Sequence, residues 1–177
     1  MANGQIREVL AVAKPVLHEL RDRRENSPHI RFELASAWIA AALQFEAYPP
    51  SCTRKLEIDG KSQEVFLQFF IEHAKLLNES QGKKILGMNE MMVFDYLIWN
   101  TDRHYTNCLV KDDKVIPIDH GNSFNNEEGQ TLKFLVADME SELLDGSIPL
   151  SMKDNIISLS NPESELGRLL RKKLSGF

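Results

Sequence analysis

Apolar and polar positions alternate in several short segments of the chain, which is the pattern of half-buried strands. The first strand is expected at 7–16, where the alternation stops at a proline. Two hairpins are indicated further along, one turning at Asp59-Gly60-Lys61 and the other at Asp112-Asp113. The strands expected for these hairpins are 51–58 with 63–72, and 107–110 with 114–118.

Other apolar segments follow a period near 3.6 residues and predict helices. Residues 30–45 are rich in alanine and stop before a pair of prolines. Residues 88–99 are apolar nearly all round, which predicts a buried helix. Further helices are expected at 131–144, 151–159 and 163–174, the last with a capping pattern from Ser160 to Glu163.

This order of elements predicts an α+β fold with two unequal parts. A small sheet-and-helix part is expected at 1–75 and a helix-rich part at 76–177, with a hinge near 69–75. Polar residues at the junction of two such parts would form a natural ligand cleft. At 177 residues the chain is long enough to bury a real core in one domain, with or without a small subdomain.

Composition and charge narrow the class of protein. Hydrophobic residues make up 42% and charged residues 27%, which is ordinary for a soluble globular protein. The net charge of −5, without a long basic stretch, gives nucleic acid binding no electrostatic support. Cys52 and Cys108 lack metal-ligand spacing, which favours a reducing compartment. Because no signal pattern begins the chain and no apolar run approaches the ~20 residues that span a bilayer, a cytoplasmic protein is expected.

Polar residues gather between two apolar segments at 100–124. Asp102 and Asn107 lie on one loop, and Asp119 follows the second strand of the short hairpin, so it can return to that loop. Two carboxylates and one carboxamide suit a hard cation such as Mg²⁺, which keeps other positions for water and substrate phosphates. One carboxylate would remain to accept a proton from an attacking hydroxyl. Phosphoryl transfer needs little beyond such positioning and charge neutralisation.

The first part of the chain supplies a positive charge for such a site. Lys14 lies at the end of an otherwise apolar strand, where an unpaired ammonium is costly. Glu33 lies near the start of the following helix. A strand lysine paired with a helix glutamate is the arrangement that fixes the nucleotide-binding lysine in kinases.

The polar cluster also carries a recognisable motif. Asp102-Arg103-His104-Tyr105-Thr106-Asn107 reads D-R-H-x-x-N and is followed by "IDHG" at 118–121, and this pair resembles the catalytic and metal-binding loops of HipA-like and phosphatidylinositol 3-/4-kinase-like kinases. The preceding "FDYLIWN" is similar to the run that precedes D-R-H in the same families. "AVAKP", "FELASAWIAAAL" and "YPPSC" resemble its lysine strand, its glutamate helix and the entry to its next strand. The similarity spans roughly residues 9 to 124.

The resemblance implies a two-lobed protein-kinase-like fold with a reduced N-terminal lobe and a helix-rich C-terminal lobe. It implies an ATP- and Mg²⁺-dependent phosphotransferase in which Asp102 is the catalytic base and His104 lies near the γ-phosphate. It further implies a nucleotide-binding Lys14 oriented by Glu33. The residues implied to bind Mg²⁺ are Asn107 and Asp119, and those implied to meet adenine in the hinge are Gln68, Phe69, Phe70, Ile71 and Glu72.

Each of these residues also has a plainer interpretation. Asp102, Asn107 and Asp119 are of residue types that are common in turns. Lys14 could extend to solvent at its strand end. His104 is interpreted equally as a packing or a catalytic residue, His120 as packing under the metal loop, and Arg103 as pairing with a carboxylate. Because no glycine-rich loop precedes Lys14, the alternative is a pseudokinase that binds nucleotide as a regulatory or scaffold module.

The sequence says less about the chemical identity of the phosphate acceptor than about the nucleotide. The segment that follows "IDHG" is short and acidic and lacks the basic stretch that binds inositol phosphate headgroups. A protein Ser/Thr hydroxyl is therefore favoured as acceptor over a lipid or a small molecule. Transfer of a nucleotidyl group in place of phosphate would fit the same residues.

Overall fold

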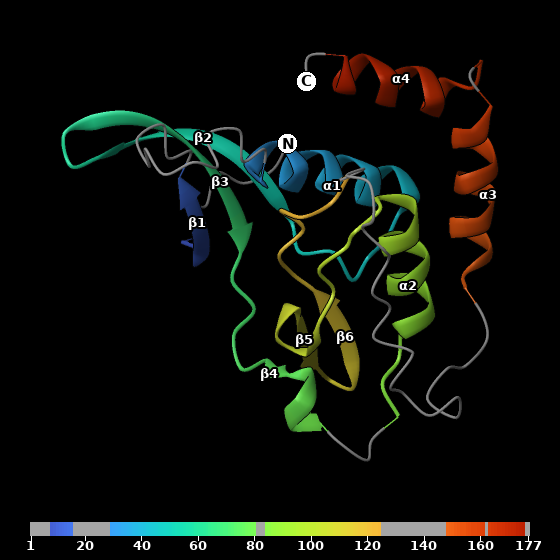
Figure 1. Ribbon diagram of the computed structural model, residues 1–177, viewed down its shortest axis with the longest axis horizontal. Helices are drawn as coiled ribbons and strands as arrows, with labels where there is room; N and C mark the ends of the chain where they lie inside the picture. Colours follow the sequence, from blue (N-terminus) through green and yellow to red (C-terminus); the bar gives the residue numbers. More distant parts are fainter. Residues whose placement is uncertain (1–7, 16–28, 81–83, 125–147, 162, 176–177) are drawn as a thin grey trace.

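A computed structural model describes residues 8–15, 29–80, 84–124, 148–161 and 163–175. These residues form two antiparallel sheets together with α-helices and short 3₁₀ turns (Figure 1). The mixed architecture confirms the predicted α+β class. Within this part of the chain, no helix has the length and apolar composition needed to cross a membrane.

The first sheet has the strand order β1-β3-β2, with β1 at Ala11–Pro15, β2 at Ser51–Ile58 and β3 at Lys61–Phe69. The β2–β3 turn is the predicted one: Asp59 and Gly60 have φ of 52° and 72°, as a two-residue hairpin turn requires. The prediction of a strand at 63–72 was wrong at both ends, because the observed strand begins at Lys61 and ends at Phe69. The strand β3 ends three residues before Glu72, and the segment after it leads out of the sheet.

Helix α1 spans His29–Leu43 and confirms the alanine-rich prediction. Its end is a Schellman turn, in which the Phe45 amide donates to the Ala40 carbonyl at 2.9 Å and the Gln44 amide donates to Ala41 at 3.2 Å. Gln44 takes the left-handed conformation of this turn, with φ of 55°. The turn directs the chain through the proline pair into β2.

The second sheet has the order β4-β5-β6, with β4 at Lys75–Leu76, β5 at Cys108–Lys111 and β6 at Lys114–Pro117. The predicted hairpin at Asp112 and Asp113 is confirmed, because both residues have positive φ. The sequence did not predict β4 or the 3₁₀ turn η1 at Leu77–Ser80. A strand of two residues is too short to show an alternating pattern.

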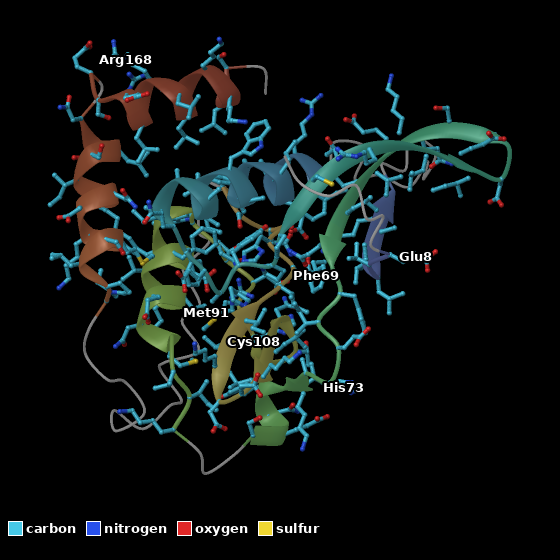
Figure 2. All side chains as sticks on the ribbon, turned by 180° about the vertical axis from the view of Figure 1, so that it is seen from behind. Glu8, Phe69, His73, Met91, Cys108 and Arg168 are labelled. Carbon is cyan, nitrogen blue, oxygen red and sulfur yellow. The ribbon has the colours of Figure 1, made fainter. Side chains whose placement is uncertain are left out.

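Helix α2 spans Met88–Leu97 and ends two residues before the predicted boundary. The expectation that it is buried all round was wrong: Tyr96 is 58% exposed and Leu97 is 40% exposed. Its buried face instead includes an acidic residue, Asp95. The same face packs on the second sheet, where Cys108 Sγ lies 3.6 Å from Met91 Sδ (Figure 2).

Two further helices, α3 at Leu150–Ser160 and α4 at Glu165–Leu174, follow near the C-terminus. The predicted capping pattern was misplaced, because Ser164 caps α4 by accepting from the Gly167 amide at 2.9 Å. The helix predicted at 131–144 lies outside the described residues. Both α3 and α4 contact α1 (Figure 1).

A hydrophobic core joins α1 to the elements that follow the first sheet. Leu43 and Tyr48 belong to the same buried cluster as Phe94 of α2, Val115 of β6 and Met152 of α3. The first sheet is connected to the second by the segment after Phe69 (Figure 1). The division into an N-terminal lobe at 1–75 and a C-terminal lobe at 76–177 stays a prediction.

Candidate functional site

The end of α2 directs the chain into the loop that carries the polar motif. Trp99 is left-handed, with φ of 51°, and the Asn100 amide donates to the Asp95 carbonyl at 2.9 Å, which forms a Schellman turn. The Asn100 side chain then makes two bonds: its Nδ2 donates to Asp95 Oδ1 at 2.9 Å, and its Oδ1 accepts from the Asp102 amide at 3.1 Å. This turn sets the position of Asp102 relative to α2.

Arg103 is buried and connects this loop with the end of β6. Its guanidinium binds the Asp95 carboxylate through Nε at 2.7 Å and Nη2 at 2.9 Å. Its Nη1 donates to the carbonyls of Asn107 at 2.6 Å and Ile118 at 2.8 Å. Burial on its own lowers the pKa of Arg103, but the Asp95 carboxylate raises it above its ordinary value. Arg103 therefore has the structural role that its interpretation gave it.

Asp102 and His104 face solvent at this loop. Asp102 Oδ2 accepts a hydrogen bond from Asn122 Nδ2 at 2.9 Å and lies 3.9 Å from His104 Nε2. The side chains of Asp102 and His104 are 42% and 49% exposed. The His104 ring also lies 2.8 Å from Thr106 Oγ1 and 3.1 Å from Asn107 Nδ2. The side chains of both predicted catalytic residues are thus accessible from solvent.

The two residues predicted to bind a metal lie at neighbouring ends of the second hairpin. Asn107 closes the 3₁₀ turn η2, Tyr105–Asn107, just before β5, and Asp119 follows β6. Their segments are joined by the Ile118 amide, which donates to the Asn107 carbonyl at 3.1 Å. Asp119 has a left-handed backbone with φ of 56°, and strained conformations of this kind cluster at functional sites.

The donor set suits a metal that keeps most of its water. Among the described residues, no three His, Cys, Asp or Glu side chains are grouped so that they could hold an ion. Asn107 Nδ2 donates to the Asp102 carbonyl at 3.0 Å, so the side-chain atom of Asn107 that could bind a metal is its Oδ1. One carboxylate and one carboxamide fit Mg²⁺ bound with substrate phosphates, and they do not fit a site made only of protein ligands.

Lys14 brings the first sheet to the same place. Its ammonium is hydrogen-bonded to Glu33 Oε1 of α1 and lies 3.1 Å from Asp119 Oδ1. Burial on its own lowers the pKa of Lys14, but the charges and hydrogen bonds of Glu33 and Asp119 raise it above its ordinary value. Strand β1, helix α1 and the loop after β6 therefore meet at the Lys14 ammonium.

Glu33 is buried, and its second oxygen faces the metal loop. Glu33 Oε2 lies 3.8 Å from His120 Nδ1, and the His120 ring packs against Tyr48 and Phe94 at centroid distances of 4.8 and 5.5 Å. Burial lowers the pKa of His120, although the neighbouring Glu33 carboxylate opposes this shift. Burial on its own raises the pKa of Glu33, but His120 and the Lys14 ammonium lower it to about 2. The Lys14 ammonium, which is hydrogen-bonded to this carboxylate, balances its negative charge.

This lowered pKa predicts an acid-sensitive contribution to stability. A carboxyl whose folded-state pKa falls from 4.5 to about 2 stabilises the fold in full above pH 4.5, and this contribution is lost as the pH falls toward 2. The free energy at stake is on the order of 3 kcal/mol. We expect Glu33→Gln to be less stable than the wild type at pH 6 and nearly equal to it at pH 2.5.

Urea unfolding followed by circular dichroism at both pH values measures this difference. Glu79→Gln is the matched control, because Glu79 is an exposed glutamate of η1, and it should unfold like the wild type at each pH. A gap between wild type and Glu33→Gln that is equally large at pH 6 and pH 2.5 would contradict the prediction.

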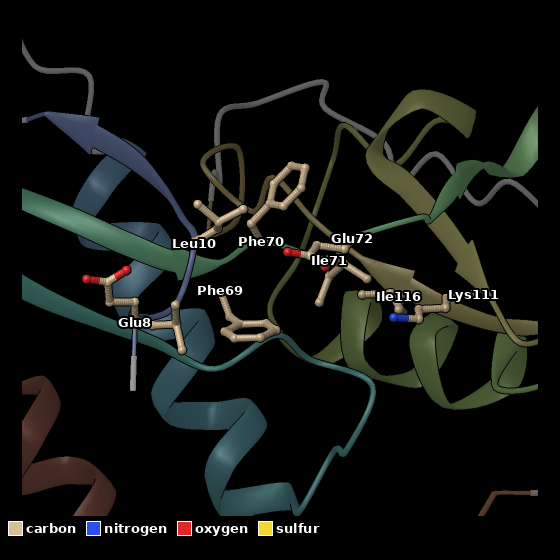
Figure 3. Close-up of a pocket in the computed structure, with 9 residues that line it drawn as sticks. Glu8, Leu10, Phe69, Phe70, Ile71, Glu72, Lys111 and Ile116 are labelled. Atoms are coloured by element: carbon tan, nitrogen blue, oxygen red, sulfur yellow. The ribbon is translucent and has the colours of Figure 1, made fainter. Parts of the chain in front are cut away.

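A cavity of about 850 Å³ lies beside the predicted hinge (Figure 3). Its lining comes from the residues just before β1, the end of β3 with the segment that follows it, and the second hairpin. The residues that line it are Glu8, Val9, Leu10, Phe69, Phe70, Ile71, Glu72, Lys111 and Ile116. Of the five predicted hinge residues, Gln68 is placed differently: it is buried, and its Nε2 donates to Ser51 Oγ at 3.4 Å.

Three residues of this arrangement were missing from the sequence-based candidates. Asp95, Asn100 and Asn122 fix the loop around Asp102, as described above. The signal for Asp95 was its position as an acidic residue inside the apolar segment 88–99. Asn100 and Asn122 carry no such signal, because asparagine is ordinary in turns.

The sequence of the chain matches a known protein family. The family model described as "Phosphatidylinositol 3- and 4-kinase" matches residues 9–174, which is most of the 177 residues and extends well past the motif pair. No curated protein matches the chain. The family match supports phosphotransferase activity of the lipid- or protein-kinase type. The chain belongs to the phosphatidylinositol 3- and 4-kinase family.

Proposed function

We propose that this protein is a cytoplasmic, HipA-like kinase that uses ATP and Mg²⁺ to phosphorylate an alcohol group, with a protein Ser/Thr hydroxyl as the acceptor. The observation that carries the proposal is the position of Lys14 between Glu33 and Asp119. This contact brings the predicted phosphate-binding lysine to the predicted metal ligand across 105 residues of sequence. In this proposal residues 1–75 and 76–177 are the two lobes, and nucleotide binds between them.

The cavity beside Phe70 has the size of a nucleotide pocket, because such pockets measure roughly 300–1,000 Å³. The amides of Phe69 and Phe70 donate to Pro50 and Leu10, so the following residue, Ile71, is the nearest backbone left for a base. Leu10 directly precedes β1, and if the extended chain alternates back to it, Leu10 and Lys14 share one face and lie roughly 13 Å apart. A nucleotide with its base near Leu10 would extend its phosphates toward Lys14.

Each predicted residue then has a defined task. Lys14 would bind the α- and β-phosphates, and Glu33 would hold its ammonium in place. Asn107 and Asp119 would hold Mg²⁺, which neutralises phosphate charge when bound. Asp102 would accept the proton of the acceptor hydroxyl, and His104, at the mouth of the same loop, would stabilise charge on the γ-phosphate or pass on a proton.

A first test replaces Lys14. Lys14→Met removes a charged hydrogen-bond donor to phosphate, and such a contact contributes about 1.5–3 kcal/mol, so we expect ATP to bind roughly 10- to 100-fold more weakly. The measurements are the ATP-dependent shift in melting temperature and the transfer of labelled γ-phosphate to casein or to phosphatidylinositol vesicles. Lys153→Met, at an exposed position of α3, is the control and should behave as the wild type.

The outcomes separate the candidate functions. Transfer to casein that Lys14→Met loses supports the proposed kinase, whereas transfer only to the vesicles would make the acceptor a lipid. A melting shift with ATP and no transfer to either acceptor identifies the pseudokinase alternative. An ATP-dependent melting shift of equal size in Lys14→Met and wild type would refute the role of Lys14. Mass spectrometry of the product distinguishes transfer of phosphate from transfer of a nucleotidyl group.

A further inference from the structure

Asn122 joins the loop after β6 to the loop that carries Asp102. Its Nδ2 donates to Asp102 Oδ2 at 2.9 Å. Its main-chain carbonyl accepts from Thr101 Oγ1 at 3.2 Å and from the Thr101 amide at 3.4 Å. Asn122 therefore binds two consecutive residues of the other loop, one through its side chain and one through its backbone.

This contact is distinctive because the other hydrogen bonds of Asp102 involve its backbone. The Asp102 amide donates to Asn100 Oδ1, and its carbonyl accepts from Asn107 Nδ2. These bonds fix the main chain but leave the carboxylate, which is 42% exposed, free to rotate. Among the described residues, Asn122 is the hydrogen-bond partner that fixes the orientation of that carboxylate.

We propose that Asn122 is a positioning residue that aims the catalytic base. The inference rests on the proposed kinase function. Asn122 holds Oδ2 of Asp102, so that Oδ1 is directed to the acceptor. In the transfer step the acceptor O–H bond breaks and its proton moves to Asp102 Oδ1. The acceptor oxygen forms a bond to the γ-phosphorus, and the bond from that phosphorus to the bridging oxygen breaks and releases ADP.

The same contact makes the orientation of the base depend on the metal loop. Asn122 lies three residues after Asp119, and both belong to the segment that Ile118 joins to Asn107. A shift of this segment would move the Asn122 amide away from Asp102 as well as moving Asp119. The base would therefore be aimed only when the segment that carries the metal ligand is in place.

The experiment compares Asn122→Ala and Asn122→Asp with the wild type. The first removes the donor, and the second replaces it with an acceptor that repels the Asp102 carboxylate. A misplacement of about 1 Å can cost ~100-fold in rate. We expect kcat at saturating ATP to fall roughly 10- to 100-fold in both variants, with the KM for ATP and the ATP-dependent melting shift within about twofold of wild type. Asn78→Asp, which adds the same charge on exposed η1, is the control.

A double variant tests the hydrogen bond without measuring activity. In Asp102→Asn/Asn122→Asp the donor and acceptor are exchanged, so the contact can form again. We expect the melting temperature to recover from its value in Asn122→Asp alone, while transfer falls below that of Asn122→Asp because the base is gone. Melting shifts of the two single variants that simply add in the double variant would show that these side chains do not interact, and the inference would be overturned.

The activity results separate this inference from the proposed function. Wild-type kcat in Asn122→Ala, in a preparation whose wild type transfers phosphate, overturns the positioning role and leaves the kinase proposal standing. A kcat that falls only in proportion to the folded fraction, measured by circular dichroism, also overturns it, because the role would then be structural. A wild type that transfers no phosphate refutes the kinase proposal, and this inference fails with it.

Discussion

Replacing Asp102 with asparagine is expected to lower the rate of phosphate transfer by about 10²- to 10⁴-fold, the range that a general base contributes. The change removes the proton acceptor and keeps the shape of the side chain. The carboxamide oxygen of the new side chain could still accept from Asn122, and the backbone bonds to Asn100 and Asn107 do not involve the altered atoms. Loss of transfer would therefore report the missing base and not a collapsed loop.

The measurement is single-turnover transfer of labelled γ-phosphate at saturating ATP, with the ATP-dependent melting shift as a check on nucleotide binding. Asp154→Asn is the control, because Asp154 is an exposed aspartate of α3, remote in sequence from the loop. A variant that loses transfer and still shows the wild-type melting shift agrees with the prediction. Transfer by Asp102→Asn within tenfold of wild type would exclude Asp102 as the base.

The elements that could be predicted are those whose signals are local. The turn at Asp59-Gly60 fixed the register of β2 on β3, because a two-residue loop of this type leaves one way to pair the strands. The alanine-rich segment before the prolines predicted α1 correctly, because the high helix propensity of alanine and the proline stop signal both act locally. The end of α2 at Leu97 was predicted two residues too late. Trp99 has a left-handed backbone conformation, and its apolar side chain gives no sequence signal for such a turn.

The contacts that organise the site could not be predicted because they depend on tertiary packing. Nothing local pairs Asp95 with Arg103 or brings Asn122 to Asp102. The resemblance implied the Lys14–Glu33 pair, which the structure contains, but the roles of these residues in binding nucleotide stay predictions. The sequence likewise offered no reason to treat Gln68 differently from the other predicted hinge residues, 69–72. The structure does, because Gln68 is buried and its side chain is hydrogen-bonded to Ser51.

His120 illustrates how the metal loop and α1 share one polar interior. Its ring is fully buried between Tyr48 and Phe94, and it was expected to pack under the metal loop. The structure adds that Tyr48 also donates to the Glu33 carbonyl at 3.3 Å. The backbone of Glu33 and the ring beside its carboxylate are thus held by the same tyrosine. The position of the Glu33 carboxylate that binds Lys14 therefore depends on the packing of Tyr48 and His120.

The largest effect on stability is expected at Arg103. Removing one partner of a buried ion pair leaves an uncompensated charge and typically costs about 3–5 kcal/mol. Arg103→Met should reach this range, because it strands the buried Asp95 carboxylate and also removes the donor to the carbonyls of Asn107 and Ile118. Urea unfolding at pH 7 measures the loss, and Arg168→Met, at an exposed position of α4, is the control.

A second variant separates the ion pair from the two carbonyl contacts. Asp95→Leu added to Arg103→Met removes the stranded carboxylate, and replacing both partners of a buried pair by apolar residues is often tolerated. We expect the double variant to be more stable than Arg103→Met but less stable than the wild type, because the carbonyls of Asn107 and Ile118 still lack their donor and Asn100 Nδ2 loses its acceptor on Asp95. Full recovery would show that Arg103 matters only as the partner of Asp95. No recovery would show that the stability depends on contacts outside the Arg103–Asp95 pair, which include those of Arg103 with the carbonyls of Asn107 and Ile118 and that of Asn100 with Asp95.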